Sequence, residues 1–314
     1  MNQVWCKWVL RGLGLCLVLA LAGCAWVSEQ QRQLIYRPTR SVSPDSAPLP
    51  TAWQHYQLAL PDTRPPEHVA LWWRPSDNAT APTLLYLHGT FRNLDGNLRK
   101  INALHAAGFN VLAVDYRGWG QSSAITPSEQ TIMADARLAW AELVRREPRP
   151  ERRVIYGHSM GSGVAVALAS TLAYPQDYGG LVLESAFTSF TDVARSAGFW
   201  ASVLNLFNTE RFASIDKISQ VHAPLLMLHG TQDHTIPIAL GAQLFAAANA
   251  PKRWLAIESA SHSDLDVIAP QAYQQALHDL MNSTQCAVAF RSGRSKPSKP
   301  TLESAAASCG ADTK

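Results

Sequence analysis

The sequence predicts a doubly wound α/β fold, in which helices cover both faces of a mostly parallel sheet. Three observations predict it. Short apolar runs recur along the middle of the chain, and each is followed by turn residues and a helical pattern. This strand–helix alternation is typical of α/β proteins. The runs are apolar throughout, as expected for strands buried on both faces of a sheet. Finally, 47% of the residues are hydrophobic and 16% are charged, which excludes a disordered chain and one that spans a membrane repeatedly.

The strands and helices can be placed in chain order. Strands are expected at residues 54–60, 68–74, 83–87, 110–114, 153–156, 180–183, 225–228 and 254–257. Helices are expected at residues 131–146, 162–172, 238–248 and 267–281. In such a sheet, ligands bind at the carboxyl ends of the strands. The chemistry of this chain is therefore sought in the residues that follow each strand.

The N-terminus has the features of an export signal. Lys7 and Arg11 precede a nearly unbroken apolar run over residues 13–22, which is shorter than the ~20 residues of a spanning helix. The run ends in Leu21-Ala22-Gly23-Cys24, which resembles the bacterial lipobox. That resemblance implies cleavage before Cys24 and a lipid on its sulfur. Ala25 is not the Asp that favours inner-membrane retention, which implies the outer membrane in a cell with two membranes. An ordinary cleaved signal or a short membrane anchor is the alternative.

The remaining ends and cysteines complete the expected organisation. Residues 1–23 are the signal and residues 24–50, rich in Pro and Ser near their end, are a tether, within which residues 33–38 could dock on the domain. Residues 51–285 form one domain, and residues 286–314 are a flexible tail. Cys286 and Cys309 could pair in an exported protein or remain free thiols. The net charge of +3 includes Lys7 and Arg11. The sequence has no stripe of basic residues, so binding of nucleic acid is not expected.

Ser159 is the candidate nucleophile. It lies in Gly157-His158-Ser159-Met160-Gly161, between an expected strand and an expected helix. A Gly-x-Ser-x-Gly run in this context forms a sharp turn that exposes the serine hydroxyl, and the flanking residues must be small. Ser162 lies beyond this turn and is expected on the helix surface or as its cap. A hydroxyl also needs a base and a group that orients the base.

Both partners are found downstream, in the expected order of acid and then histidine. Asp233 follows the strand at residues 225–228, within a Gly-x-x-Asp-x-x-Ile-Pro run, and His262 follows the strand at residues 254–257. With these motifs, residues 54–281 resemble the α/β-hydrolase family, especially its serine-aminopeptidase-like and bacterial lipoprotein-like esterase branches. The resemblance implies that Asp233 orients His262, and that His262 acts as general base and then as general acid. It also implies a short helical lid at about residues 185–222.

The oxyanion formed in acyl transfer needs two backbone N–H donors. One is expected from Met160, directly after the nucleophile. The other follows the strand at residues 83–87, where His88-Gly89-Thr90-Phe91 resembles the His-Gly turn of the family. This implies the N–H of Thr90 or, as the alternative, that of Phe91. His88 is expected to brace the turn. The run from Asp115 to Ser122 also matches the family, and it is expected to shape a neighbouring turn without taking part in the chemistry.

Several other residues are alternatives for these roles. Glu184 and Asp192 follow the strand at residues 180–183, which is the next strand after the one that precedes Ser159. Some family members place their acid there. Among the histidines, His158 and His229 adjoin the motifs but are expected to pack or to form hydrogen bonds. His234 is an alternative base, but it is adjacent to Asp233 and lies on the wrong loop. Asp264 and Asp266 are expected at a solvated helix start. Neither a metal motif nor a dinucleotide or phosphate loop was found, so no cofactor and no metal are expected.

The expected activity is cleavage of a carboxylic ester or thioester through an acyl-enzyme intermediate, with a small acyl-ester substrate. Aromatic residues in the lid could line an acyl pocket, or they could pack a small cap against the sheet. Two other functions stay open: an aminopeptidase or amidase, and a non-catalytic binding lipoprotein on a hydrolase fold. The lipid on Cys24 would hold the protein at a membrane outside the cytoplasm.

Overall fold

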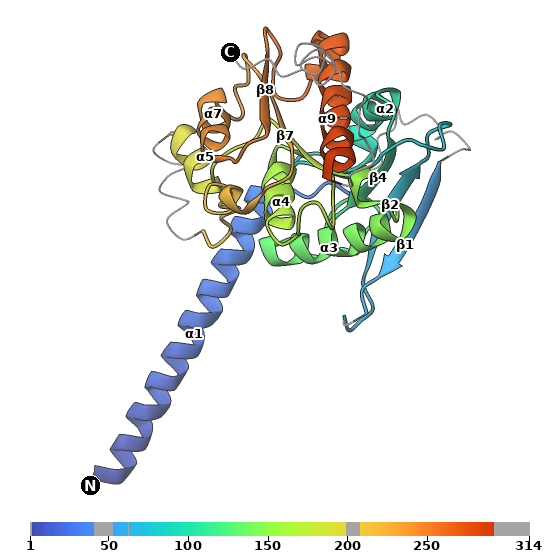
Figure 1. Cartoon of the computed structure of the whole chain (residues 1–314). Helices are drawn as coiled ribbons and strands as arrows, with labels where there is room; N and C mark the ends of the chain where they lie inside the picture. Colours follow the sequence, from blue (N-terminus) through green and yellow to red (C-terminus); the bar gives the residue numbers. More distant parts are fainter. Residues whose placement is uncertain (1, 41–52, 62, 199–207, 292–314) are drawn as a thin grey trace, which may run out of the picture.

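Eight strands form one twisted sheet, which helices cover on both faces (Figure 1). The computed structural model describes residues 2–40, 53–61, 63–198 and 208–291. In chain order the strands are β1 (Gln54–Ala59), β2 (His68–Arg74), β3 (Thr83–Leu87), β4 (Asn110–Asp115), β5 (Arg153–His158), β6 (Gly180–Glu184), β7 (Leu225–Gly230) and β8 (Lys252–Ile257). They lie in the order β1-β2-β4-β3-β5-β6-β7-β8, which confirms the predicted fold class.

The direction of the strands places four loops together. β2 runs antiparallel to both β1 and β4. The neighbouring strands in the remainder of the sheet, β4-β3-β5-β6-β7-β8, are all parallel. The central strands β3, β5, β6 and β7 are buried along their whole length, as their apolar sequences predict. Because these strands are parallel, the residues that follow β3, β5, β7 and β8 meet at one edge of the sheet.

Each face of the sheet has its own apolar core. One core packs side chains of α3 (Glu129–Arg146), α4 (Met160–Ala169) and α7 (Ile238–Ala247) against the sheet. The other packs α2 (Leu98–Ala106), α8 (Leu265–Ile268) and α9 (Pro270–Arg291) against the opposite face. α5 (Phe190–Ser196) lies in the segment predicted as the lid. Helix α2 was not predicted from the sequence, and the single helix expected at residues 267–281 is divided into α8 and α9.

The N-terminal segment is one helix, α1 (Asn2–Tyr36), which projects from the domain and meets it at its carboxyl end (Figure 1). Residues 24–36, expected as part of a tether, thus belong to this helix, and residues 41–50 lie outside the described part. The stretch from Leu13 to Tyr36 is long and apolar enough to cross a membrane, although a signal sequence near an N-terminus meets the same test. The helix ends at Tyr36, two residues before Pro38, where a helix is expected to stop.

The C-terminal end also differs from the prediction. Helix α9 continues to Arg291, so residues 286–291, which were expected in the tail, are helical. Residues 292–314 lie outside the described part of the chain; because Cys309 is among them, the pairing of Cys286 with Cys309 lies outside it too.

Candidate active site

Ser159 stands at a strained turn between β5 and α4. Its backbone has φ 55° and ψ −125°, in a region that non-glycine residues rarely adopt. Such strain persists only where the surroundings enforce it. A Cβ atom at Gly157 would lie 2.2 Å from the carbonyl oxygen of Gly161, and one at Gly161 would lie 2.0 Å from that of Leu87. The two glycines are therefore required for the turn that holds Ser159.

The structure brings the three predicted side chains into one hydrogen-bonded chain. His262 Nε2 lies 2.9 Å from Ser159 Oγ, and His262 Nδ1 lies 2.8 Å from Asp233 Oδ2. Asp233 and Ser159 are buried, and the His262 side chain is largely covered. With Nδ1–H donating to the carboxylate, Nε2 is free to accept the hydroxyl proton. This arrangement can activate a serine hydroxyl for attack on a carbonyl carbon.

The surroundings of Asp233 keep its carboxylate charged. Burial on its own would raise the pKa of this carboxyl group, but hydrogen bonds from the rings of His229 and His262 hold it well below its usual range. The backbone N–H groups of Thr235 and Ile236 also donate to Oδ1, at 2.9 and 2.8 Å. A carboxylate fixed in this way both orients His262 and stabilises its protonated form.

The predicted oxyanion donors flank Ser159. Met160 is the first residue of α4, where an N–H group has no carbonyl acceptor within the helix. Thr90 belongs to the loop after β3, and a Cβ atom at Gly89 would lie 3.0 Å from the Cβ of Ser159, so this loop passes close to the serine. Trp119 Nε1 donates to the carbonyl oxygen of Thr90 at 2.7 Å. The run from Asp115 to Ser122 thus lies beside the Thr90 loop and contacts it through Trp119.

The buried histidines next to the motifs have packing or hydrogen-bonding positions, as expected. His88 is fully buried, and its Nδ1 lies 2.6 Å from the carbonyl oxygen of Gly89. His158 Nε2 lies 3.1 Å from the carbonyl oxygen of His262, so His158 supports the loop that carries the candidate base. Burial lowers the pKa of His158 to about 4, and the ring is neutral at pH 7. His229 Nε2 lies 3.0 Å from the carbonyl oxygen of Ile236, and His234 is exposed.

The alternative acids are engaged elsewhere. Glu184 is fully buried and pairs with Lys100 at 2.7 Å, and Lys100 also pairs with Asp266 at 2.6 Å. The prediction of a solvated Asp266 is therefore wrong, because its carboxylate is buried against Lys100. Asp192 accepts from Thr188 Oγ1 and Ser189 Oγ, both at 2.7 Å, at the start of α5.

Asp264 and Ser162 lie near the starts of α8 and α4. Asp264 lies at the start of α8, as expected, and its side chain accepts from Ser261 N at 2.6 Å and not from an N–H group of the helix. The Ser162 side chain is fully buried and donates to the carbonyl oxygen of Ser159 at 2.6 Å, so its expected place on the helix surface is wrong. Lys100 was missed, because it lies in the unpredicted helix α2.

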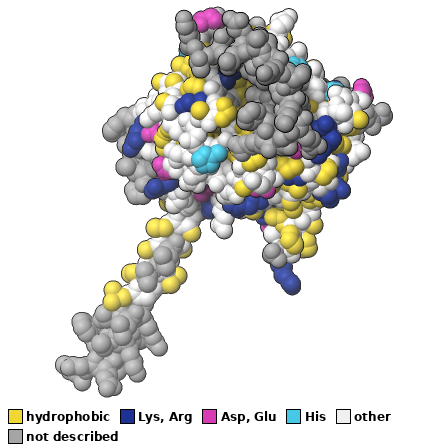
Figure 2. Space-filling view, in the orientation of Figure 1, with side chains coloured by type: hydrophobic (Ala, Val, Ile, Leu, Met, Phe, Trp, Pro, Cys, Tyr) yellow, Lys and Arg dark blue, Asp and Glu magenta, His cyan; other side chains and the backbone are white. Residues whose placement is uncertain are grey.

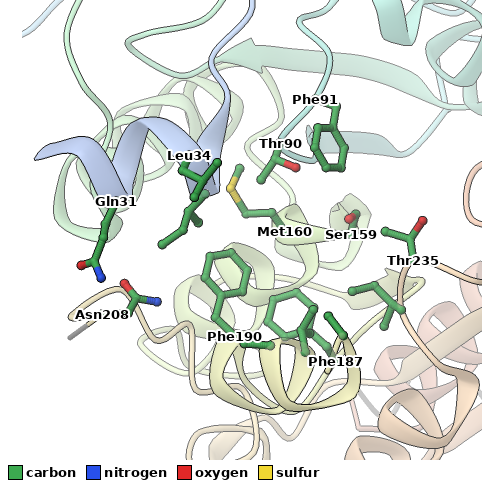
Figure 3. A pocket seen from close by; sticks show the side chains of 15 residues that line it. Gln31, Leu34, Thr90, Phe91, Ser159, Met160, Phe187, Phe190, Asn208 and Thr235 are labelled. Carbon is green, nitrogen blue, oxygen red and sulfur yellow. The ribbon is translucent and has the colours of Figure 1, made fainter. Parts of the chain in front are cut away.

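A pocket of about 290 Å³ opens beside Ser159 and is almost wholly apolar (Figure 3). Figure 3 shows Phe187 and Phe190 along one side, with Ser159 and Thr235 toward one end and Gln31 and Leu34 toward the other. None of the described lining residues carries a charge. They are Gln31, Leu34, Ile35, Thr90, Phe91, Ser159, Met160, Phe187, Phe190, Val193, Ala194, Ala197, Asn208, Thr235 and Ile236.

The lid residues divide between the two roles left open by the sequence. Phe187 and Phe190 line the pocket and stack at 5.2 Å between ring centroids. Phe212 is buried and packs against Phe190 at 5.1 Å, so it supports the pocket from outside. Sequence reasoning missed the pocket residues of α1, although it allowed residues 33–38 to dock. Within the described residues, no group of three or more His, Cys, Asp and Glu side chains could hold a metal ion.

Comparisons with known proteins agree with this architecture. A model for the serine aminopeptidase S33 family matches residues 79–211, which include Ser159 and end before Asp233. An uncharacterized protein of Mycobacterium tuberculosis is 30% identical over 279 residues, covering 87% of this chain and 96% of that protein. The lysophosphatidylserine lipase ABHD12 of Danio rerio is 33% identical over 196 residues, covering 57% of this chain and 50% of that protein.

Solved structures show the same fold. An esterase of Pyrococcus furiosus superposes with a TM-score of 0.63 at 18% identity, covering 79% of this chain and 97% of that one. An α/β hydrolase of Vibrio vulnificus superposes with a TM-score of 0.65 at 20% identity, covering 79% of this chain and 91% of that one. At these identities the likeness concerns the fold alone.

Proposed function

The chain belongs to the α/β-hydrolase superfamily, and on that premise we propose that it is a serine hydrolase that cleaves a carboxylic ester or thioester through an acyl-enzyme on Ser159. The hydrogen-bonded chain from Ser159 through His262 to Asp233 carries this proposal. Its two distances, 2.9 and 2.8 Å, are those needed for proton transfer without rearrangement.

The proposed reaction has two halves. His262 Nε2 takes the proton of Ser159 as Oγ bonds to the carbonyl carbon, and the oxyanion accepts hydrogen bonds from the N–H groups of Thr90 and Met160. His262 then gives its proton to the leaving oxygen or sulfur, the carbonyl re-forms, and the acyl group remains on Ser159. In the second half, water takes the place of the leaving group: His262 takes a proton from the water as its oxygen bonds to the acyl carbon. His262 then returns this proton to Ser159 Oγ as the bond between Oγ and the acyl carbon breaks, and the acid product departs.

The pocket favours an acyl ester over a substrate with a free N-terminus. The α-amino group of a peptide is largely protonated at neutral pH, and a buried cation needs an anionic partner. The described residues that line the pocket include no Asp or Glu. An acyl chain, by contrast, matches the side chains of Leu34, Met160 and Phe190. The description of one relative as a lysophosphatidylserine lipase also supports ester cleavage.

Replacement of the nucleophile tests this proposal. Ser159→Ala is expected to lower the turnover of an aryl ester by a factor of about 10⁴ or more. It is also expected to abolish labelling by a fluorophosphonate. Ser170→Ala, at the other end of α4, is the matched control and keeps both activities. Retained turnover in Ser159→Ala would contradict the assignment. Turnover of aminoacyl amides but not of acyl esters by the unaltered protein would favour the amidase instead.

We also propose that the protein is exported and held at a membrane through a lipid on Cys24. Both Cys16 and Cys24 are exposed on α1, and only Cys24 ends a lipobox-like run. In cells fed a labelled fatty acid, Cys24→Ala is expected to lose the label. Cys16→Ala keeps it, because Cys16 is removed with the signal. Persistent labelling of Cys24→Ala would show that Cys24 is not the lipidated residue.

A further inference from the structure

The carboxyl end of α1 is built into the catalytic domain. Tyr36 is fully buried, and its hydroxyl donates to Glu210 at 2.5 Å. Its ring packs edge-on against Trp119, with centroids 6.1 Å apart, and lies 6.4 Å from that of Phe190. Burial and the nearby Glu210 carboxylate raise the pKa of Tyr36 far above its usual value, so the hydroxyl remains a donor. The end of α1 therefore has a fixed position relative to the pocket.

The residues after α1 fasten the helix to the loop that carries Thr90. The Arg37 guanidinium lies over the Phe91 ring, 5.5 Å from its centroid, and Thr39 Oγ1 donates to the carbonyl oxygen of Phe91 at 3.0 Å. The Gly120 N–H donates to the carbonyl oxygen of Thr39 at 2.9 Å. These contacts join the N-terminal segment to both runs that shape the candidate oxyanion site.

Three residues of α1 then form part of the pocket itself. Gln31, Leu34 and Ile35 line it together with Ser159 (Figure 3). Leu34 remains 53% exposed, and Ile35 is partly buried against the core. The pocket is thus bounded at this side by a half-exposed leucine and not by a closed wall.

The same helix carries the pocket to a membrane surface. The sequence has no charged residue from Gly12 to Ser28, and Trp26 and Val27 are 65% and 43% exposed. Figure 2 shows hydrophobic side chains on the surface of the projecting helix. Charges resume at Glu29, two residues before Gln31, the first pocket residue of α1. An apolar helix is thus followed by an exposed tryptophan and then by charged residues. This is the order expected across a membrane–water interface.

This placement holds for either form of the N-terminus. If the helix stays intact, its apolar part lies in the bilayer. If the chain is cut before Cys24, a lipid on Cys24 lies ten residues before Leu34, which is about 15 Å along a helix. In both cases the pocket residues of α1 stand close to the membrane surface.

We propose that Leu34 and Ile35 bind the acyl chain of a membrane lipid ester, which enters the pocket from the bilayer along α1. This inference rests on the proposed ester cleavage at Ser159 and adds the class of substrate and its source. The ester carbonyl lies at Ser159 and the chain extends past Met160 and Phe190 toward α1. Long acyl chains reach Leu34, whereas short ones end before it.

A chain-length series tests the contact with α1. For p-nitrophenyl esters, Leu34→Gln is expected to lower the ratio of kcat/KM for dodecanoate to that for butanoate by roughly fourfold to fifteenfold, the effect of losing apolar contact with one or two methylene groups. Val27→Gln makes the same kind of apolar-to-polar change at an exposed residue of α1 outside the pocket, and it is expected to leave the ratio unchanged. An unchanged ratio in Leu34→Gln would overturn the proposal.

The same series separates this inference from the proposed function. If the assignment of Ser159 fails, the unaltered protein hydrolyses neither ester, or Ser159→Ala hydrolyses both. If only the inference fails, both esters are hydrolysed and the ratio does not respond to Leu34. Equal rates of fluorophosphonate labelling in Leu34→Gln and Val27→Gln verify that both variants are folded.

A vesicle experiment tests the source of the substrate. The full chain is anchored in phosphatidylglycerol vesicles, and a long-chain monoacylglycerol is placed either in the same vesicles or in a separate population. We expect turnover at least roughly tenfold faster in the shared membrane, because anchoring raises the effective concentration of the ester. Equal rates in the two arrangements would show that the ester arrives through water and would overturn entry from the bilayer.

Discussion

The two sides of Ser159 are built in different ways. On one side, His262 and Asp233 stand on loops after β8 and β7, above a buried network of Lys100 and its two carboxylates. On the other side, the pocket is apolar and owes much of its lining to α1 and α5, which lie outside the sheet. The polar side depends on charges held in fixed positions, whereas the pocket side depends on apolar contact.

This difference separates chemistry from selection of the substrate. Changes on the polar side are expected to affect every ester equally, because each substrate needs the same proton transfers. Changes on the pocket side are expected to alter preference among esters. The superfamily hosts many reactions on one fold, and an added helix that completes the pocket is one way to direct it to a substrate.

The largest effect is expected for Asp233→Asn. An amide cannot hold His262 in the required tautomer or stabilise its charged form, and kcat is expected to fall on the order of 10⁴-fold. Steady-state kinetics should show the same loss for butanoate and dodecanoate esters. Asp192→Asn, which alters an acid at the start of α5, serves as control and keeps turnover near that of the unaltered protein. A chain-length dependence in Asp233→Asn would erase the distinction between the two sides.

The next effect is on stability, through Lys100. Lys100→Met leaves the buried carboxylates of Glu184 and Asp266 without their cation, which is expected to lower the free energy of unfolding by about 3–5 kcal/mol. Arg99→Met removes a second partner of Asp266, but Arg99 is 47% exposed, so the loss should be below about 1 kcal/mol. Urea unfolding measures both. Equal losses would show that the buried network is not a special support of the polar side.

The smallest effect is a pH dependence that we assign to His158. Burial lowers the pKa of this ring from 6.5 to about 4, despite the nearby Glu184, while His262 and Lys100 act in the same direction as burial. Between these two pH values the unfolded chain binds more protons than the folded one. His158 therefore does not lower the free energy of unfolding above pH 6.5. As the pH falls toward 4, protonation of His158 in the unfolded chain lowers the free energy of unfolding by about 3 kcal/mol.

His158→Gln tests this assignment, since an amide can still donate to the carbonyl oxygen of His262 but does not titrate. Unfolding free energies at pH 7 and pH 4.5 should differ less in His158→Gln than in the unaltered protein. An identical difference in the two proteins would place the titrating group elsewhere.

The polar side was predictable because its signals are local. The strands β5, β7 and β8 each contain a short apolar run, and Ser159, Asp233 and His262 follow them within five residues. In a parallel sheet, residues that follow the strands meet at one edge, so chain order alone brings them together. The strand limits of β2 and β3 agree with the prediction at both ends.

The pocket side was not predictable because its contacts join distant parts of the chain. Tyr36 meets Glu210 across 174 residues, and nothing near Tyr36 in the sequence indicates that partner. The Pro- and Ser-rich stretch at residues 41–48 favoured a tether, although docking of residues 33–38 was left open. Lys100 escaped notice for the same reason: its burial is stabilised by Glu184 and Asp266, 84 and 166 residues away.

The central claim, that Ser159 is the nucleophile, is tested most directly by locating a covalent adduct. The folded full-length protein is treated with a fluorophosphonate, digested, and mapped by tandem mass spectrometry. We predict one adduct, on Ser159 and not on the buried Ser162 only three residues later. An adduct on Ser162, or a folded protein that takes up no label, would contradict the assignment.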